Sequence, residues 1–328
     1  MTCERMTTDV LVVGGGLAGC TLGYLLRQGG RDVLVAELLD ARTKNKLCAG
    51  LVIPLAAHLV NDIYGADFMA SLTPFLSSGR TLQTDRGGVT APHQLAALPR
   101  KHLDDFCLNH YLEAGGRLVD RVSLVAVDEE AHIATFRDLR SGGSLEVAYR
   151  ELVGADGATS AVRRILAGHN QDICPALEGV VPQVRDDTVF EYSVSPLGYR
   201  WYIPQGGRAS VGCMYFAAKA PACRERVEEF CAQLGVEVPP LRGAAIPTGS
   251  EVLLRAGQAW LVGDAAGLIN PVEGAGIHTA LISAKALAEA LLGGTPYEQA
   301  MEPAARQTER EYLNVALTYT LRYMEIGK

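Results

Sequence analysis

The chain has 328 residues, of which 48% are hydrophobic and 20% charged, and this length allows a large core in one domain or two interleaved domains. The formal net charge of −7 argues against a nucleic-acid partner, because phosphates need a basic face and the sequence contains no basic stripe. The eight cysteines form no C-x-x-C pair and no metal-ligand cluster with histidine, and no cleavable signal precedes the first predicted strand. We therefore expect reduced thiols, no metal site and a cytoplasmic protein.

The segment from Asp9 to Glu37 predicts a dinucleotide site. Asp9–Val13 is typical of a strand buried on both faces, residues 17–28 have helical spacing, and the glycine-rich turn between them matches G-x-G-x-x-G. The turn residues that we expect to contact the cofactor are Gly14, Gly16, Leu17, Ala18 and Gly19. The following helix N-terminus attracts a pyrophosphate, and Glu37 is placed to accept hydrogen bonds from a ribose. A membrane span or signal over Val10–Leu26 is the alternative, which the three glycines and the closing acid disfavour.

The rest of the chain predicts further elements. Helices are expected over 54–64, 100–114, 224–234 and 309–324. Strands are expected over 80–89, 117–127, 131–136, 145–149, 151–153, 188–194, 200–203 and 209–216. The segment 261–292 is expected to run from a strand through a glycine-rich turn into a long helix. Alternating runs punctuated by Pro and Gly between 174 and 253 indicate a second, antiparallel domain that supplies a substrate wall.

Two later motifs make the prediction specific. Leu152–Arg164 contains Asp156-Gly157, and Trp260–Ile277 contains Gly263-Asp264 followed by Gly274-Ala275-Gly276. In this order and spacing, the three motifs resemble the FAD-binding flavoprotein superfamily of para-hydroxybenzoate hydroxylase and geranylgeranyl reductase, over nearly the whole chain. The resemblance implies an α/β fold, with a doubly wound, Rossmann-like FAD-binding domain and an interleaved antiparallel β-sheet substrate domain. The FAD-binding domain would comprise 7–75, 96–170 and 250–328, and the substrate domain 76–95 and 171–249.

The resemblance also assigns contacts with FAD. Asp264 corresponds to the family aspartate that binds the ribityl hydroxyls, and the helix that follows Gly274 stabilises negative charge on the reduced ring. Asp156 and Gly157 would approach the pyrophosphate, with Arg163 holding their loop, and Arg100 resembles a family arginine near the adenosine half. The other implied contacts are Cys48, Ala49, Gly50, Gly263, Pro271, Gly274, Ala275, Gly276 and Ile277. Structural roles stay open: a helix N-cap for Asp264, a turn for Asp156 and a surface position for Arg100.

Three segments resemble the geranylgeranyl reductase branch of this superfamily. Residues 46–50 resemble its K-P-C-G-G turn over the flavin, residues 199–204 its Y-x-W-x-F-P strand that lines a lipid-sized cavity, and residues 244–247 its G-x-I-P turn. Leu47, Ala49 and Gln205 replace the usual proline, glycine and lysine. We therefore expect an altered substrate cavity.

This resemblance implies that hydride moves from N5 of reduced FAD to a carbon–carbon double bond of an isoprenoid or another small apolar substrate. The electrons would come from NAD(P)H or a reduced electron-carrier protein. The candidate catalytic residues are Cys48, Tyr199 and Trp201, with Tyr202 and His278 as lesser candidates. A packing role for Cys48 stays open, because a thiol is a weak acid, and Trp201 is either cavity wall or core.

Other functions and the role of the last helix stay open. An aromatic hydroxylase is the main alternative, and a non-catalytic FAD-binding subunit is a third hypothesis. A halogenase is disfavoured because the sequence lacks a W-x-W-x-I-P motif. The helix expected over 309–324 would close the cavity, mediate self-association or touch a membrane surface, and its lack of a basic stripe favours cavity closure.

Overall fold

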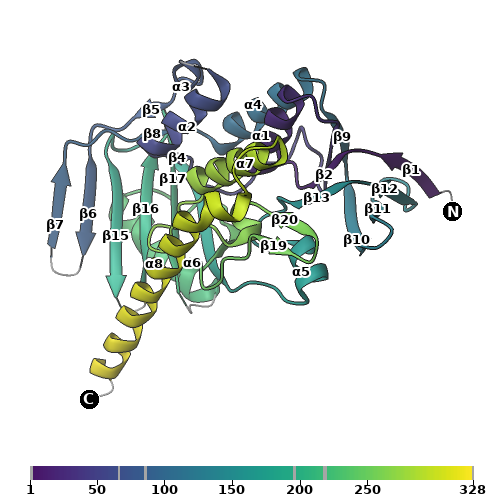
Figure 1. Ribbon diagram of the computed structural model, residues 1–328. Helices are drawn as coiled ribbons and strands as arrows, with labels where there is room; N and C mark the ends of the chain where they lie inside the picture. The colour runs from purple at the N-terminus through teal and green to yellow at the C-terminus, as the bar shows by residue number, and fades with distance from the viewer. Residues whose placement is uncertain (1–2, 66, 85–86, 195–196, 217–219, 327–328) are drawn as a thin grey trace.

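Two large sheets lie side by side in the computed structural model, which describes residues 3–65, 67–84, 87–194, 197–216 and 220–326 (Figure 1). The six-stranded sheet has the order β19 (Arg255–Ala256), β20 (Ala259–Leu261), β13 (Glu151–Gly154), β2 (Val10–Val13), β3 (Val33–Glu37), β9 (Arg117–Asp120). The seven-stranded sheet has the order β18 (Arg242–Pro247), β14 (Ile173–Pro182), β17 (Arg208–Tyr215), β16 (Leu197–Pro204), β15 (Thr188–Val194), β6 (Arg80–Thr84), β7 (Gly87–Ala91). This arrangement confirms the predicted α/β fold class.

The centre of the six-stranded sheet is parallel and buried. β2 pairs in parallel with β3 and with β13, and every residue of β2 and β3 is buried. Such strands read as continuous apolar runs because helices cover both faces of the sheet. The alternative of a membrane span over Val10–Leu26 is wrong, since this stretch forms β2, a turn and most of α1 (Leu17–Gln28).

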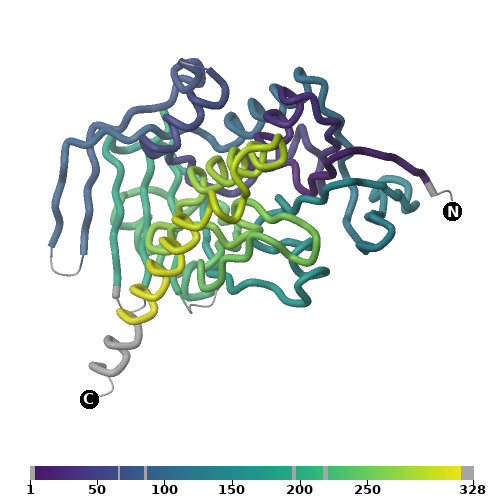
Figure 2. Tube along the Cα trace, viewed as in Figure 1, coloured from purple at the N-terminus to yellow at the C-terminus, as the bar shows by residue number. Residues whose placement is uncertain are grey.

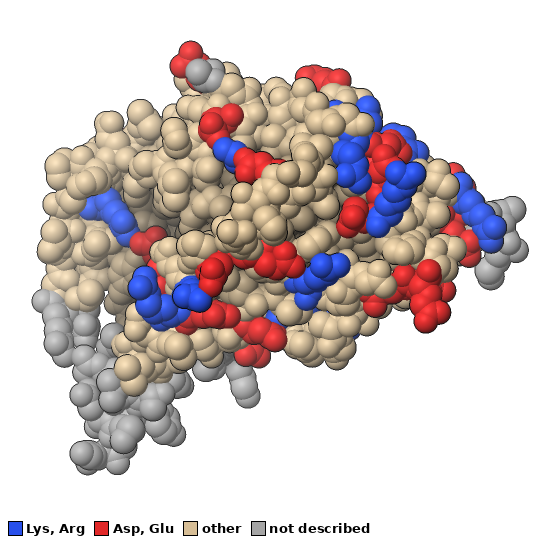
Figure 3. All heavy atoms as spheres, in the orientation of Figure 1, with Lys and Arg blue, Asp and Glu red and all other residues tan. Residues whose placement is uncertain are grey.

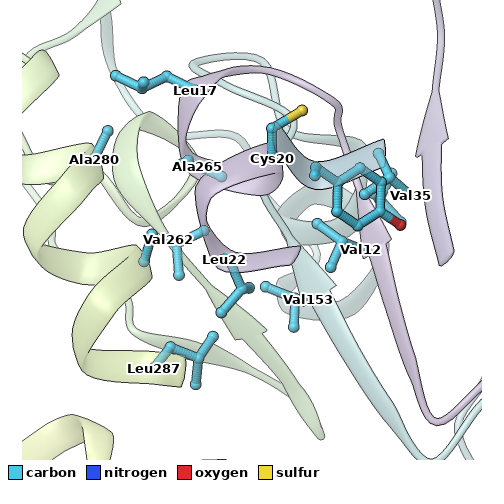
Figure 4. Packing of buried hydrophobic residues seen from close by; sticks show 14 of the residues in the cluster. Val12, Leu17, Cys20, Leu22, Val35, Val153, Val262, Ala265, Ala280 and Leu287 are labelled. Carbon is cyan, nitrogen blue, oxygen red and sulfur yellow. The ribbon is translucent and has the colours of Figure 1, made fainter. Parts of the chain in front are cut away.

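Helices α1, α4 (Arg100–Glu113) and α7 (Ile277–Leu291) build the core over this sheet. α1 lies between α4 and α7 and contacts both. Figure 4 shows Leu22 of α1 close to Val153 of β13 and Leu287 of α7, and all three side chains are fully buried. α1 is therefore held by packing on several sides.

The seven-stranded sheet is antiparallel except where β15 runs parallel to β6. Helix α6 (Ala220–Leu234) covers one face, where Val227 and Phe230 pack against Tyr202 and Val211. The other face carries Phe190, Tyr199, Trp201, Ile203 and Met214. The sheet includes both β6–β7 and β14–β18, which supports our proposal of a substrate domain at 76–95 and 171–249; these boundaries stay a prediction.

Two of the strands predicted from the sequence are each divided into two strands in the structure. Residues 80–89 begin a hairpin of β6 and β7, and residues 117–127 divide at Arg121, whose φ is +57°. β9 then joins the six-stranded sheet, while β10 (Val122–Asp128) starts a four-stranded sheet with β11 (Ile133–Asp138), β12 (Ser144–Ala148) and β1 (Cys3–Thr7). β1, which was not predicted from the sequence, pairs in parallel with β12.

Short elements complete the described chain. The strands β4 (Leu51–Val52), β8 (Ala96–Ala97) and β5 (Phe75–Leu76) form a small sheet near the helices α2 (Pro54–Tyr64) and α3 (Phe68–Ser71). A short helix η1 (Gly263–Ala266) follows β20, and α5 (Ala161–Ala167) follows β13. Among the residues described, none of the helices combines the length and apolar character that crossing a bilayer takes.

Helix α8 (Tyr297–Ile326) begins well before the predicted helix. Its first half packs on α7, and the Thr308 hydroxyl donates to the Ile269 carbonyl at 3.0 Å. Leu313 and Leu317 are 65% and 58% exposed, and closure of the cavity by this helix stays a prediction. The side chains of Tyr319, Thr320 and Tyr323 lie outside the described residues. Figure 2 shows the coloured part of α8 continuing from its contact with α7 across the front of the molecule.

Leu22→Ala is expected to lower the free energy of unfolding by about 2–5 kcal/mol, because it leaves a cavity between α1, α7 and the sheet. Leu313→Ala, a matched change at an exposed position, is expected to change it by less than about 0.5 kcal/mol. Urea unfolding followed by circular dichroism measures both. Equal effects of the two changes would contradict the packing described here.

Candidate functional site

The turn between β2 and α1 has the geometry of an anion site. Gly14 has φ +106°, and a Cβ on Gly19 would lie 2.0 Å from the Gly14 carbonyl oxygen, so the close approach of α1 to β2 requires glycine at both positions. No described side chain caps α1 at Gly16, and a Cβ on Gly16 would meet nothing within 4 Å. The helix therefore presents free N–H groups and the positive end of its dipole to open space.

The three motifs predicted to hold the cofactor converge on this turn. A Cβ on Gly14 would lie 2.4 Å from the Ala155 carbonyl oxygen, next to Asp156 in the second motif. A Cβ on Gly263 would lie 3.4 Å from the Cβ of Ala18, which places the third motif against α1. The buried residues Leu17 and Ile277 begin α1 and α7 and belong to the same core.

Glu37 lies at the end of β3 beside the turn, 7% exposed. Its Oε2 accepts hydrogen bonds from the Gly15 N–H at 2.8 Å and from Lys44 Nζ at 2.7 Å, and its Oε1 accepts from the Leu39 N–H at 2.9 Å. The carboxylate is thus fixed where the sequence predicted a ribose contact.

Asp264 belongs to η1 and lies beside the N-terminus of α7. Its Oδ2 accepts from Lys46 Nζ at 2.9 Å, and its Oδ1 would lie 2.9 Å from a Cβ on Gly276, the N-cap residue of α7. No described side chain caps α7 by a hydrogen bond, so the alternative role of Asp264 as N-cap is wrong. The loop before α7 is closed by the Asn270 N–H, which donates to the Ala275 carbonyl at 3.0 Å; Pro271 and Gly274 lie within this loop.

Asp156 holds the start of α5. Its oxygens accept from the Ser160 hydroxyl at 2.5 Å and from the Ala161 N–H at 2.7 Å, and Ser160 is the N-cap of α5, whose hydroxyl accepts from the Arg163 N–H. Gly157 follows with φ +80°. Arg163 is 1% exposed, with its guanidinium donating to Glu251 and to the Ala265 carbonyl, so it ties α5 to η1. A direct contact of Asp156 and Gly157 with the pyrophosphate stays a prediction.

The turn from Cys48 to Gly50 is held between the seven-stranded sheet and the small sheet of β4, β8 and β5. The Gln205 amide donates to the Ala49 carbonyl at 2.8 Å, and the Leu98 N–H donates to the Gly50 carbonyl at 3.0 Å. Gln205, which departs from the family lysine, thus joins the end of β16 to this turn.

Arg100 is 7% exposed, so the alternative of a surface arginine is wrong. Its guanidinium donates to Asp104 at 2.9 Å and also hydrogen-bonds the Cys48 side chain. Burial acts to lower the pKa of Arg100, but Asp104 and then Cys48 outweigh burial and raise that pKa above its usual value. The structure places Arg100 beside Cys48, and its predicted position near the adenosine half stays untested.

An aromatic wall faces the loop before α7. Tyr199 and Trp201 lie on one face of β16, with ring centroids 5.8 Å apart, and Phe190 and Tyr192 extend this wall on β15. A Cβ on Gly274 would lie 3.2 Å from both the Tyr199 hydroxyl and the Met214 sulfur. The Tyr199 hydroxyl donates to the Glu273 carbonyl, so the wall and the third motif are in direct contact.

Tyr202 and His278 were the two lesser catalytic candidates. Tyr202 points to the opposite face of the sheet, where its hydroxyl accepts from the Val184 N–H at 2.8 Å, so its proposed catalytic role is wrong. His278 lies in the first turn of α7; burial lowers its pKa, and its Nδ1 has no hydrogen-bond partner among the described residues.

Glu178 is a buried acid on the cavity face that the sequence analysis missed. Its Oε1 accepts from the Ser210 hydroxyl at 2.8 Å, and Ser210 in turn accepts from the indole N–H of Trp201 at 2.9 Å. Arg242 lies opposite Glu178 on β18. Burial raises the pKa of Glu178 to about 7, against which Ser210 and Arg242 act. This chain of hydrogen bonds fixes the orientation of Trp201 in the wall.

A hollow of about 370 Å³ adjoins the Cys48 turn. Its lining includes Gln205, which bonds Ala49, together with Thr73, His102 and Arg208. It therefore offers polar and cationic groups next to the apolar wall. On the face drawn in Figure 3, basic and acidic side chains are otherwise intermixed.

The comparisons with known proteins agree with this geometry. A family model described as an FAD binding domain matches residues 7–173, more than half of the 328 residues. The chain belongs to the FAD-binding domain family. A second model, described as tryptophan halogenase, matches residues 170–325 of this flavoprotein.

Curated relatives and a solved structure resemble the flavoprotein over most of its length. It is 27% identical to geranylgeranyl diphosphate reductase of Rhodobacter capsulatus, covering 88% of this chain and 75% of that protein. It is 27% identical to menaquinone reductase of Mycolicibacterium smegmatis, covering 89% and 78%. A geranylgeranyl bacteriochlorophyll reductase-like protein of Thermoplasma acidophilum shares the fold, with a TM-score of 0.80, 22% identity and coverage of 97% and 88%. The predicted resemblance to the geranylgeranyl reductase family is thereby confirmed.

The residues present fit FAD, and the chain is an FAD-dependent oxidoreductase. Among the described residues, no side chain caps α1 at Gly16 or α7 at Gly276, and a carboxylate lies beside each helix start: Glu37, which is buried, and Asp264, which is half-buried. Uncapped helix ends suit the pyrophosphate and the electron-rich edge of the ring, and carboxylates suit hydroxyls. The individual contacts remain our proposal. Two contacts were not predicted from the sequence: that of Lys44 with Glu37, and that of Lys46, the first residue of the predicted K-P-C-G-G-like turn, with Asp264.

Gly16→Ala is expected to leave the stability of the ligand-free flavoprotein within about 0.5 kcal/mol of wild type, because the added methyl meets no protein atom. It is expected to weaken FAD binding at least 10-fold, because the methyl points to where phosphate oxygens approach the backbone. Urea unfolding and a fluorescence titration with FAD measure the two effects. As the matched control, Gly19→Ala is expected to destabilise the protein itself, and normal FAD affinity of Gly16→Ala would contradict this site.

Glu178→Gln is expected to remove a pH dependence of stability. In the folded protein burial raises the pKa of Glu178 to about 7, whereas in the unfolded chain the carboxyl group has its usual pKa of 4.5. This contribution is therefore fully present below pH 4.5 and is lost as the pH rises through 7, in total up to about 3 kcal/mol. Urea unfolding between pH 4.5 and 8 measures it; the exposed change Glu225→Gln is expected to follow the wild-type curve, and an identical curve for Glu178→Gln would contradict the assignment.

Proposed function

We propose that this flavoprotein reduces carbon–carbon double bonds of an isoprenoid or another apolar substrate. The observation that carries the proposal is the contact between the aromatic face of the seven-stranded sheet and the flavin loop at Gly274, with the Cys48 turn beside them. The names of the relatives, geranylgeranyl diphosphate reductase and menaquinone reductase, support a substrate with a long apolar chain. The cationic hollow at Arg208 supports a polar group at the end of such a chain.

The chain's own residues would bind and orient the substrate. Phe190, Tyr192 and Trp201 offer apolar surface that excludes water, which strengthens electrostatic interactions at the ring. Reduced flavin, when bound, supplies the hydride. The Tyr199 hydroxyl donates a hydrogen bond to the Glu273 carbonyl, and burial raises the pKa of Tyr199 well above its usual value. We therefore assign Tyr199 to positioning the flavin loop.

We assign the proton for the second carbon to Cys48. Its side chain is half-buried, hydrogen-bonded by Arg100 and packed against the core of the flavin-binding helices, while the next residue, Ala49, packs against the aromatic wall. Cys48 therefore lies between the two. Arg100 fixes the direction of the sulfur. The electrons would come from NAD(P)H or a reduced carrier protein in the cytoplasm.

An oxygen-using reaction is the second candidate, because the tryptophan halogenase model matches the half of the chain that forms the aromatic wall. An aromatic hydroxylase would use the same flavin position with molecular oxygen. It predicts substrate-stimulated oxygen consumption and a hydroxylated product.

The proposal is tested under anaerobic conditions. Reduced enzyme mixed with geranylgeranyl diphosphate, geranylgeraniol or menaquinone is expected to reoxidise its flavin and to yield a saturated product, followed by absorbance and mass spectrometry. Cys48→Ala is expected to slow reoxidation roughly 100-fold, the usual effect of losing a positioned acid, while FAD affinity is retained. Cys223→Ala, a buried cysteine behind the sheet, is the matched control. Flavin that stays reduced with every substrate, or product that forms only with oxygen, would contradict the proposal.

A further inference from the structure

One short segment after β3 reaches both carboxylates that we assign to FAD. In the segment 40–46, Lys44 Nζ lies 2.7 Å from Glu37 Oε2, and Lys46 Nζ lies 2.9 Å from Asp264 Oδ2. Lys44 Nζ also donates to the Gly15 carbonyl in the fingerprint turn. The Lys44 side chain is 10% exposed, which is unusual for a lysine outside a built site.

The backbone of this segment is fixed from both sides. Arg242 of β18 donates to the Asn45 carbonyl at 2.8 Å, and Lys101 of α4 donates to the Arg42 carbonyl at 2.7 Å. The Ala41 N–H donates to Asp120 at the end of β9 at 2.9 Å. The two lysines are therefore directed inward by a segment tied to three elements.

The position of the two ammonium groups matches the charge of a diphosphate. Glu37 marks the ribose side and Asp264 the ribityl side of the site, and in FAD the diphosphate joins these two halves. The N-terminus of α1 offers roughly half an elementary charge, whereas a diphosphate in FAD carries two negative charges. Lys44, which touches the turn at Gly15, and Lys46, on the Asp264 side, bring further positive charge to the two ends of this region.

We propose that residues 40–46 form a diphosphate clasp, in which Lys44 and Lys46 bind the two phosphates of FAD while Glu37 and Asp264 orient the lysines and accept the neighbouring hydroxyls. A carboxylate has about four acceptor positions, so it serves an ammonium group and a hydroxyl together. The clasp concerns FAD binding alone, so it stands or falls independently of the proposed alkene reduction.

Binding of three ligands to the full chain tests the clasp. Lys44→Met is expected to weaken binding of FAD and of ADP about 10-fold at low salt, equal to about 1.4 kcal/mol, and Lys46→Met to weaken FAD similarly. Riboflavin, which has no phosphate, is expected to bind all variants equally. Lys285→Met, a lysine paired with Asp62 on α2, is the matched control and is expected to bind FAD as wild type does. Lys44→Arg is expected to retain most of the affinity for FAD.

The same measurements in a Glu37→Gln variant distinguish the clasp from an alternative in which Lys44 only neutralises the charge of Glu37. If Lys44 only cancels the charge of Glu37, then Lys44→Met has no effect on ADP binding once Glu37→Gln is present. The clasp predicts that Lys44→Met still weakens ADP binding about 10-fold in that background, and that the variants lower the salt dependence of FAD binding. Unchanged ADP affinity in the Glu37→Gln background, or equal losses for riboflavin and FAD, would overturn the proposal. Circular dichroism of each variant before titration shows that the losses come from folded protein.

Discussion

The contact of Gly19 with the carbonyl of Gly14 determines how close α1 comes to β2, and the cofactor site depends on this approach. With the helix seated there, its first N–H groups point into open space beside Gly16, and Ala18 reaches the third motif at Gly263. The position of α1 on the sheet is rigid because the buried strands β3 and β13 both pair with β2 and helices cover all three strands. A side chain at Gly14 or Gly19 would therefore disturb both the core and the anion site.

The other half of the site depends on alternation along the strands of the seven-stranded sheet. Because successive side chains point to opposite faces, β16 gives Tyr199 and Trp201 to the flavin side and Tyr202 to α6. Hydrogen bonds then fix the sheet against the cofactor region at separate points, through Tyr199 to Glu273 and through Gln205 to Ala49. The replacement of the family lysine by Gln205 keeps a donor at this junction while removing a charge from the edge of the cavity.

Local patterns explain what the sequence predicted. The bounds of α1 and α2 match the prediction because glycine, proline and apolar spacing mark them, and the family model and relatives confirm FAD as the cofactor. Non-local features were missed. The break at Arg121 depends on a left-handed backbone at a residue that is not glycine, and β1 depends on a partner strand about 140 residues away. The contacts of Lys44 with Glu37 and of Lys46 with Asp264 were not predicted, because the reach of a long side chain does not follow from spacing. The face of Tyr202, in contrast, follows from the period of two and was predictable.

The six-stranded sheet has a consequence for the order in which the protein matures on the ribosome. β2 pairs with β13, and β13 pairs on its other side with β20, the strand that leads to Asp264. β20 lies far behind β2 in the sequence. The nascent chain therefore exposes the fingerprint helix long before the segment carrying Asp264 and Gly276 has been synthesised. Flavin captured during translation would be held by one end only, so firm incorporation of the prosthetic group belongs to the period after the last third of the polypeptide has emerged.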